Sequence, residues 1–343
     1  MPWPAANVAT MRSKSVTILS SILVSLFLIG STRSQDPVET IRIESDLVDL
    51  KVSVLGFLSD TDALLLEQKD FEILEDGTKQ EIAFFAAADA PFDLLLLLDV
   101  SGSTSGKLKL VRNSARRFVD AARPVDRLAI MTFTDQPYML SNFSLDRRRL
   151  KKDIEYIDDA YGGTNFWDSL DDVLKNIVPR NQTRRTAIVV MTDGVDNALP
   201  DVKGEGSRTT FETLLENVRR SEALVFPIYL DTEKKNEKQP DVPHSAYATA
   251  REQLSHLATS SGTMLYHATR LQDLDRVYAQ VIRDLGRIYS IGYKPSNRAL
   301  DGKWRQVEVH LVGRPNLQAR AKRGYYAKQS TASDTEKKLV REP

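Results

Sequence analysis

The chain has 343 residues, enough for about two domains, and no cysteine, so disulfides, thiolate metal sites and cysteine nucleophiles are excluded. Lys plus Arg and Asp plus Glu each total 47, which gives a formal net charge of zero. A non-specific nucleic-acid binder needs a basic surface, so this balance argues against nucleic acid as a partner. Hydrophobic residues at 41% and charged residues at 27% are typical of a globular protein.

An apolar run near the amino end has the organisation of a secretory signal peptide. Arg12 and Lys14 precede the run, residues 16–30, and small polar residues follow it up to Ser34. We expect residues 1–34 to be removed by cleavage after Ser34, which predicts a periplasmic or secreted protein. The alternative is an uncleaved anchor, the one predicted link to a membrane. It is less favoured because the run is shorter than the ~20 apolar residues that span a bilayer.

Residues 35–90 have a β pattern. Apolar and polar side chains alternate over residues 48–54, which predicts a half-buried strand. Two further apolar stretches, residues 71–74 and 82–85, flank an Asp-Gly turn at 76–77, and this arrangement predicts a hairpin.

From residue 91 to 287 the pattern changes to alternating strands and helices. Residues 92–98 read FDLLLLL, which is typical of a strand buried on both faces of a parallel sheet. Similar apolar runs recur downstream, with helical patterns between them. The predicted strands are 128–133, 187–191, 224–230 and 264–266, and the predicted helices are 108–122, 149–160, 167–178, 211–221, 248–260 and 271–287. The alternation predicts an α/β fold with a doubly wound, mostly parallel sheet.

A β pattern returns over residues 288–327. A lone hairpin is marginal in water, so we expect this segment to pair with residues 40–86 in one small β domain, with the α/β domain inserted between them. The alternative is that both flanks pack separately on the α/β sheet. The predicted strands are 289–293, 304–312 and 318–326. The polar tail, residues 328–343, is expected to be disordered.

Polar side chains gather where the predicted strands end. Asp99, Ser101 and Ser103 follow the first buried strand, Asp193 follows the third, and Thr164 precedes a helix. Ligands of open α/β sheets bind outside the carboxyl ends of the strands, so these groups share one rim. Two carboxylates and three hydroxyls form an all-oxygen site of the kind that suits Mg²⁺. For Ser103 alone, or for Thr164 alone, a helix cap is the better explanation.

Three neighbouring polar residues are assigned structural roles. Asp196 and Asn197 are interpreted as turn formers. Asp168 is expected to stabilise the start of its helix through the helix dipole, with anchoring of the Thr164 loop as the alternative.

Three motifs carry a resemblance to a known family. The segments DVSGS (99–103), GGTNFWDSL (162–170) and MTDGVDN (191–197) resemble the von Willebrand factor A domain (VWA domain) and its metal-ion-dependent adhesion site (MIDAS). The resemblance covers about residues 91–287. It implies Mg²⁺ or Mn²⁺ as the cofactor, with these direct or water-mediated ligands: Asp99, Ser101, Ser103, Thr164 and Asp193.

The flanking segments DFEILEDGTKQEI (70–82), YSIGY (289–293) and RGYYA (323–327) are similar to exported bacterial VWFA-related proteins. This second resemblance extends over most of the mature chain. In the wider family the metal keeps one coordination position for a partner carboxylate, which implies an unknown protein ligand that presents Asp or Glu.

These observations predict an exported, metal-dependent, adhesion-type binding module that is not an enzyme. One alternative is a metal-dependent phosphoester-processing enzyme, because phosphotransferases of the haloacid dehalogenase type also place an aspartate at the end of a first strand. They have a second aspartate two residues later, where this chain has Ser101. No G-x-S-x-G elbow and no phosphate-binding G-x-x-x-x-G-K-[ST] loop occurs. The other alternative is a purely structural envelope module.

Overall fold

The computed structural model describes residues 47–56, 66–86, 88–102, 108–158, 162–178, 184–233 and 242–329. The expected signal peptide, Ser103 and residues 330–343 of the expected tail lie outside these residues. No helix in the described part of the chain is long and apolar enough to cross a membrane.

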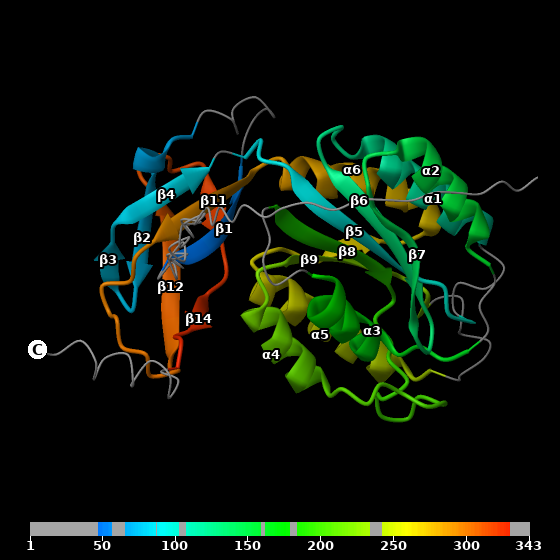
Figure 1. Ribbon diagram of the computed structural model, residues 1–343. Helices are drawn as coiled ribbons and strands as arrows, with labels where there is room; N and C mark the ends of the chain where they lie inside the picture. Colours follow the sequence, from blue (N-terminus) through cyan, green and yellow to red (C-terminus); the bar gives the residue numbers. More distant parts are fainter. Residues whose placement is uncertain are drawn as a thin grey trace, which may run out of the picture. The chain divides into compact units, whose positions relative to one another are not determined.

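A six-stranded sheet in the order β10-β9-β8-β5-β6-β7 forms the centre of the α/β part (Figure 1). All neighbouring strands are parallel except β7, which runs antiparallel to β6. Leu98 of β5 pairs with Thr132 of β6 and Met191 of β8, so these three strands end at the same edge. The strands are β5 (Phe92–Asp99), β6 (Arg127–Phe133), β7 (Pro137–Ser144), β8 (Arg185–Thr192), β9 (Leu224–Leu230) and β10 (Tyr266–Ala268).

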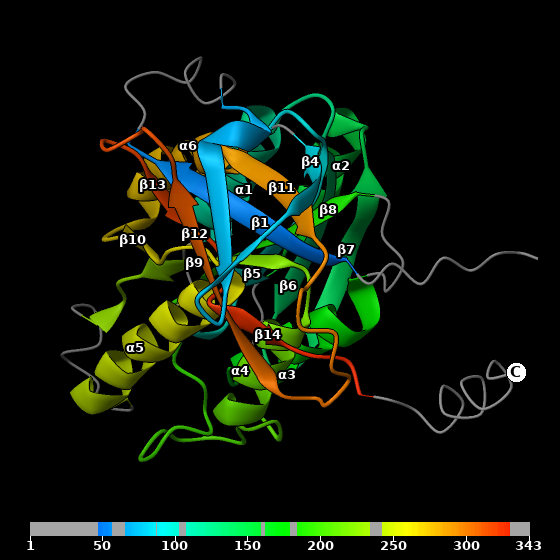
Figure 2. The same ribbon diagram turned by 90° about the vertical axis from the view of Figure 1, so that its left-hand side faces the viewer.

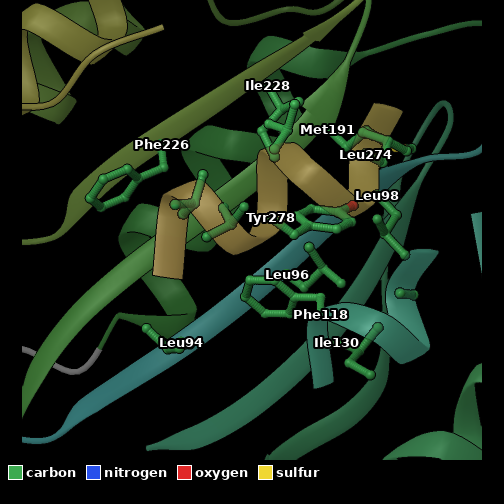
Figure 3. Packing of buried hydrophobic residues seen from close by; sticks show 14 of the residues in the cluster. Leu94, Leu96, Leu98, Phe118, Ile130, Met191, Phe226, Ile228, Leu274 and Tyr278 are labelled. Atoms are coloured by element: carbon green, nitrogen blue, oxygen red, sulfur yellow. The ribbon is translucent and has the colours of Figure 1, made fainter. Parts of the chain in front are cut away.

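Helices cover both faces of this sheet. Leu94, Leu96 and Leu98 pack with α1, α2 and α6, as Figure 3 shows for part of this cluster, whereas Leu95 and Leu97 pack with α3, α4 and α5. Every residue of β5, β8 and β9 is buried. The predicted doubly wound, mostly parallel α/β sheet is confirmed. The helices are α1 (Leu108–Ala121), α2 (Arg147–Asp153), α3 (Phe166–Asp172), α4 (Phe211–Arg220), α5 (His244–Ser261) and α6 (Leu274–Leu285).

Elements of the α/β part differ from the sequence prediction, most clearly β7 and α2. β7 was not predicted, because an edge strand that is only partly buried has no continuous apolar run. The helix expected over residues 149–160 begins earlier and is shorter. Asp146 sets its start by accepting hydrogen bonds from the backbone N–H groups of Arg148 and Arg149, and α2 ends at Asp153.

The two flanks of the α/β part pair with each other in a β-sandwich. One sheet has the order β13-β1-β11-β4, and its four strands are labelled in Figure 2; the other has the order β14-β12-β2-β3. β1 pairs with β11, and β2 with β12, both antiparallel. The buried residues between the sheets include Val52, Ile73 and Tyr289. The strands are β1 (Val48–Leu55), β2 (Phe71–Glu75), β3 (Thr78–Gln80), β4 (Ile82–Ala86), β11 (Ile288–Tyr293), β12 (Trp304–Leu311), β13 (Gln318–Arg320) and β14 (Gly324–Tyr326).

The predicted hairpin between residues 71–74 and 82–85 is wrong. β2 turns at 76–77 and pairs with β3, whereas β4 belongs to the other sheet and pairs with β11. β3 has only three residues, too few for alternation to identify it. The strand predicted over residues 318–326 also divides, into β13 and β14 of different sheets.

Arg185, the first residue of β8, holds both chain crossings between the sandwich and the α/β part. Its buried guanidinium donates to the carbonyl oxygens of Ala88 (3.1 Å), Ala90 and Ile288. It also lies over the ring of Phe92, 4.0 Å from the ring centre. Burial lowers the pKa of Arg185 to about 10, so it remains charged at neutral pH. This junction lies at the amino edge of the sheet, opposite the predicted site.

Candidate metal-binding site

Asp99, the last residue of β5, is fully buried, and its carboxylate accepts hydrogen bonds from the segment just after β5 and from the end of β8. Its Oδ1 accepts hydrogen bonds from the backbone N–H (3.0 Å) and the hydroxyl (2.6 Å) of Ser101. Its Oδ2 accepts from the Thr192 hydroxyl at 2.6 Å. These contacts set the orientation of the carboxylate at the rim.

Asp193 directly follows β8 and is also buried. Its Oδ1 accepts from the backbone N–H of Val195 at 3.1 Å, and its Oδ2 from the hydroxyl of Thr232, just past β9, at 2.7 Å. A threonine at the carboxyl end of the neighbouring strand or just beyond it therefore orients each carboxylate: Thr192 for Asp99 and Thr232 for Asp193.

The electrostatics of this pair favour a bound cation. The pKa of Asp99 is raised to about 7, chiefly by burial and next by the negative charge of Asp193, while the hydrogen bonds from Ser101 and Thr192 act in the opposite direction. Two buried carboxylates that raise each other's cost of ionisation are stabilised by a positive charge between them. The donor set of carboxylate and hydroxyl oxygens also suits a hard divalent cation.

Thr164 is buried in the loop before α3 and is fastened to the loop that follows Asp193. Its N–H donates to Asn197 Oδ1 (3.2 Å), and the N–H of Asn197 donates back to the Thr164 carbonyl (2.9 Å). The Trp167 N–H donates to Oδ2 of the buried Asp196 at 2.9 Å. The interpretation of Asp196 and Asn197 as turn formers is therefore incomplete. Asp196 does accept from the Ala198 N–H within its own turn (2.8 Å), but both residues also join two loops of the site.

Asp168 anchors the segment beyond this turn. Its carboxylate accepts from the backbone N–H groups of Arg208 (2.9 Å) and Thr209 (2.8 Å). Burial acts to raise the pKa of Asp168, but these hydrogen bonds outweigh it and hold the pKa below its ordinary value. Asp168 thus secures the 207–209 segment, while Asn197 and Asp196 hold the Thr164 loop directly.

Four of the five predicted ligand residues are described, all of them buried at the carboxyl edge of the sheet: Asp99, Ser101, Thr164 and Asp193. Ser103 lies outside the described residues. Among the residues that the structure describes, no group of three or more His, Asp or Glu side chains has metal-binding spacing. A cation bound here would therefore depend on hydroxyls as well as carboxylates.

Thr192 and Thr232 were not identified as site residues from the sequence. Thr192 directly precedes Asp193, and its position at the end of a buried strand was the available signal. Thr232 has no such signal, because β9 becomes a neighbour of β8 only in the folded sheet.

Comparisons with known proteins agree with the sequence resemblance. Residues 94–195 match the family model described as the von Willebrand factor type A domain, and this segment contains all five predicted ligand residues. The predicted von Willebrand factor A domain is therefore confirmed for residues 94–195. A comparison with curated protein sequences finds no match.

Several solved structures are similar to this chain. BatB from Bacteroides thetaiotaomicron shares 13% identity at a TM-score of 0.43, covering 57% of this chain and 99% of BatB. The vWF domain of the type V pili tip protein Mfa5 from Porphyromonas gingivalis shares 14% identity at a TM-score of 0.43, and the match covers 57% of this chain and 94% of that domain. Proximal thread matrix protein 1 from the mussel byssus, in a structure with a zinc-occupied MIDAS motif, shares 15% identity at a TM-score of 0.45. The match covers 60% of this chain and 48% of that protein.

Proposed function

We propose that this chain is an exported, metal-dependent protein-binding module of the adhesion type. In this proposal Mg²⁺ or Mn²⁺ is held by Asp99, Ser101, Ser103, Thr164 and Asp193. The observation that carries the proposal is the pair of buried, hydroxyl-held carboxylates, Asp99 and Asp193, at the ends of neighbouring strands. Export is proposed from the signal-peptide pattern of residues 1–34.

The chain's own groups suit capture of a carboxylate from a protein partner. A divalent cation at this site would supply positive charge and a coordination position for an incoming Asp or Glu. Thr192 and Thr232 hold the two carboxylates in fixed orientations, so little reorganisation is needed when the cation and the partner arrive. Asn197 and Asp196 keep the Thr164 loop in place for the same reason.

The enzyme alternative has less support from the site. The Ser101 hydroxyl, in the position of the acid/base aspartate of dehalogenase-type phosphotransferases, donates its hydrogen bond to Asp99. We expect no turnover of p-nitrophenyl phosphate with Mg²⁺, measured by release of nitrophenolate. Turnover that disappears in Asp99→Asn would favour the enzyme instead.

Capture of envelope proteins tests the function. Wild type and the double variant Ser101→Ala/Ser103→Ala are compared, each with Mg²⁺ and with chelator. We expect specific capture only by wild type in Mg²⁺, and the same result for the control Ser255→Ala, which removes an exposed hydroxyl from α5. Equal capture in all samples would contradict the adhesion role. Magnesium-dependent stability without capture would favour a purely structural module.

A further inference from the structure

Asp135 places an exposed carboxylate next to the proposed metal-binding site. It lies two residues beyond the end of β6, and β6 pairs with β5 so that Phe133 is opposite Asp99. The backbone N–H of Asn165 donates to the carbonyl of Thr134 at 2.9 Å, which joins the β6–β7 turn to the Thr164 loop.

Two glycines make room for this side chain. A Cβ atom on Gly162 would lie 2.5 Å from Asp135 Oδ2, and one on Gly163 would lie 2.9 Å from Oδ1. Gly162 also has a φ of +147°, which side-chain-bearing residues rarely adopt. The carboxylate of Asp135 therefore lies directly against the backbone that precedes Thr164.

Asp135 differs from Asp99 and Asp193 in being exposed at the rim. It forms no ion pair with any residue that the structure describes. A cation would stabilise the buried pair, whereas the exposed Asp135 carboxylate can interact with a partner that approaches the rim. An incoming partner carboxylate would experience repulsion from Asp135 unless the partner also carried a positive charge beside it.

We propose that Asp135 determines specificity by selecting partners in which Lys or Arg neighbours the metal-binding Asp or Glu. This inference rests on the proposed function and specifies the partner class. The cation alone cannot distinguish one partner carboxylate from another, so selection must come from rim groups. Attraction to a basic neighbour and repulsion of an acidic one act in the same direction, and each exposed pair contributes about fivefold or less in affinity.

Displayed heptapeptides with a fixed central Glu test the proposal, with a matched central-Gln library as the control. Both libraries are selected on the immobilised protein in Mg²⁺ and in chelator. The proteins are wild type, Asp135→Lys and the net-charge control Glu81→Lys, which makes the same change of charge at an exposed residue in the sandwich. For wild type and the control we expect magnesium-dependent enrichment of central-Glu peptides with Lys or Arg beside the Glu. For Asp135→Lys we expect enrichment of peptides with Asp or Glu beside the central Glu. We also expect this variant to bind the peptides selected on wild type about fivefold more weakly.

The outcomes separate the two proposals. Magnesium-dependent enrichment on wild type of central-Glu peptides that lack a basic neighbour would overturn the role of Asp135 and leave the proposed function intact. An unchanged preference for basic neighbours in Asp135→Lys would have the same meaning. No magnesium-dependent preference for Glu over Gln in wild type would overturn both. Calorimetric titration of Mg²⁺ into Asp135→Asn should give an affinity within about twofold of wild type. A loss as large as that of Asp99→Asn would make Asp135 a metal-holding group and overturn the specificity role.

Discussion

Buried carboxylates have different hydrogen-bond partners at the two edges of the central sheet: arginines at one edge and hydroxyls at the other. At the amino edge, Asp93 accepts from the guanidinium groups of Arg127 and Arg184, and Asp126 accepts from Arg123 at 2.8 Å. At the carboxyl edge, hydroxyls orient Asp99 and Asp193.

This difference separates stability from binding. The arginines at the amino edge supply positive charge, so the buried carboxylates there are compensated within the fold. The hydroxyls at the carboxyl edge direct Asp99 without adding charge, and its raised pKa shows that ionisation is costly. We therefore expect changes at the amino edge to reduce stability and changes at the carboxyl edge to reduce metal binding.

Asp99→Asn should have the largest effect on metal binding. We expect the affinity for Mg²⁺ to fall by more than about 100-fold, because one of two charged ligands is lost. In chelator the free energy of unfolding should be unchanged or higher, because removal of one carboxylate relieves repulsion of the other. Calorimetric titration and urea unfolding measure the two effects. Unchanged Mg²⁺ affinity would contradict the proposed site.

Asp93→Asn should reduce the stability of the fold without weakening Mg²⁺ binding. Loss of this carboxylate leaves Arg127 and Arg184 without their charged partner, and because both arginines are partly exposed we expect a loss of about 2 kcal/mol in unfolding free energy. The Mg²⁺ affinity should remain that of wild type. If Asp93→Asn weakened Mg²⁺ binding as strongly as Asp99→Asn, the two edges would not be independent.

Thr232→Val keeps the side-chain shape but removes the donor to Asp193. We expect about tenfold weaker Mg²⁺ binding, because the carboxylate is no longer held in one orientation. Thr78→Val, an exposed substitution on β3, is the control. Equal Mg²⁺ affinities in both variants would show that Thr232 has no positioning role.

Asp168→Asn should have the smallest effect, and it should depend on pH. The folded-state pKa is lowered, so the stabilisation is present above the ordinary pKa of 3.8 and is lost as the pH falls through the folded value. At pH 7 in chelator we expect the variant to be about 1 kcal/mol less stable. Urea unfolding from pH 7 to pH 3 should show the two curves converging. A constant difference over this range would mean that the charge of Asp168 is not involved.

The sequence was sufficient for the elements whose signals are local. Residues 92–98 and 224–230 are continuous apolar runs, and both are strands buried on both faces. Asp99 and Asp193 were identified because a polar residue at the end of such a run must lie at the sheet edge. The antiparallel β7 and three-residue β3 were missed because edge and very short strands have little periodicity.

The contacts that join distant segments were decided only by the tertiary structure. Thr232 reaches Asp193 because β9 neighbours β8, and Asp135 meets Gly162 because the β6–β7 turn and the Thr164 loop share one edge. Neither pairing has a sequence signature, because the order of the strands in the folded sheet brings these distant segments together. Local pattern therefore predicted which residues could bind a cation, and strand order decided which residues orient them.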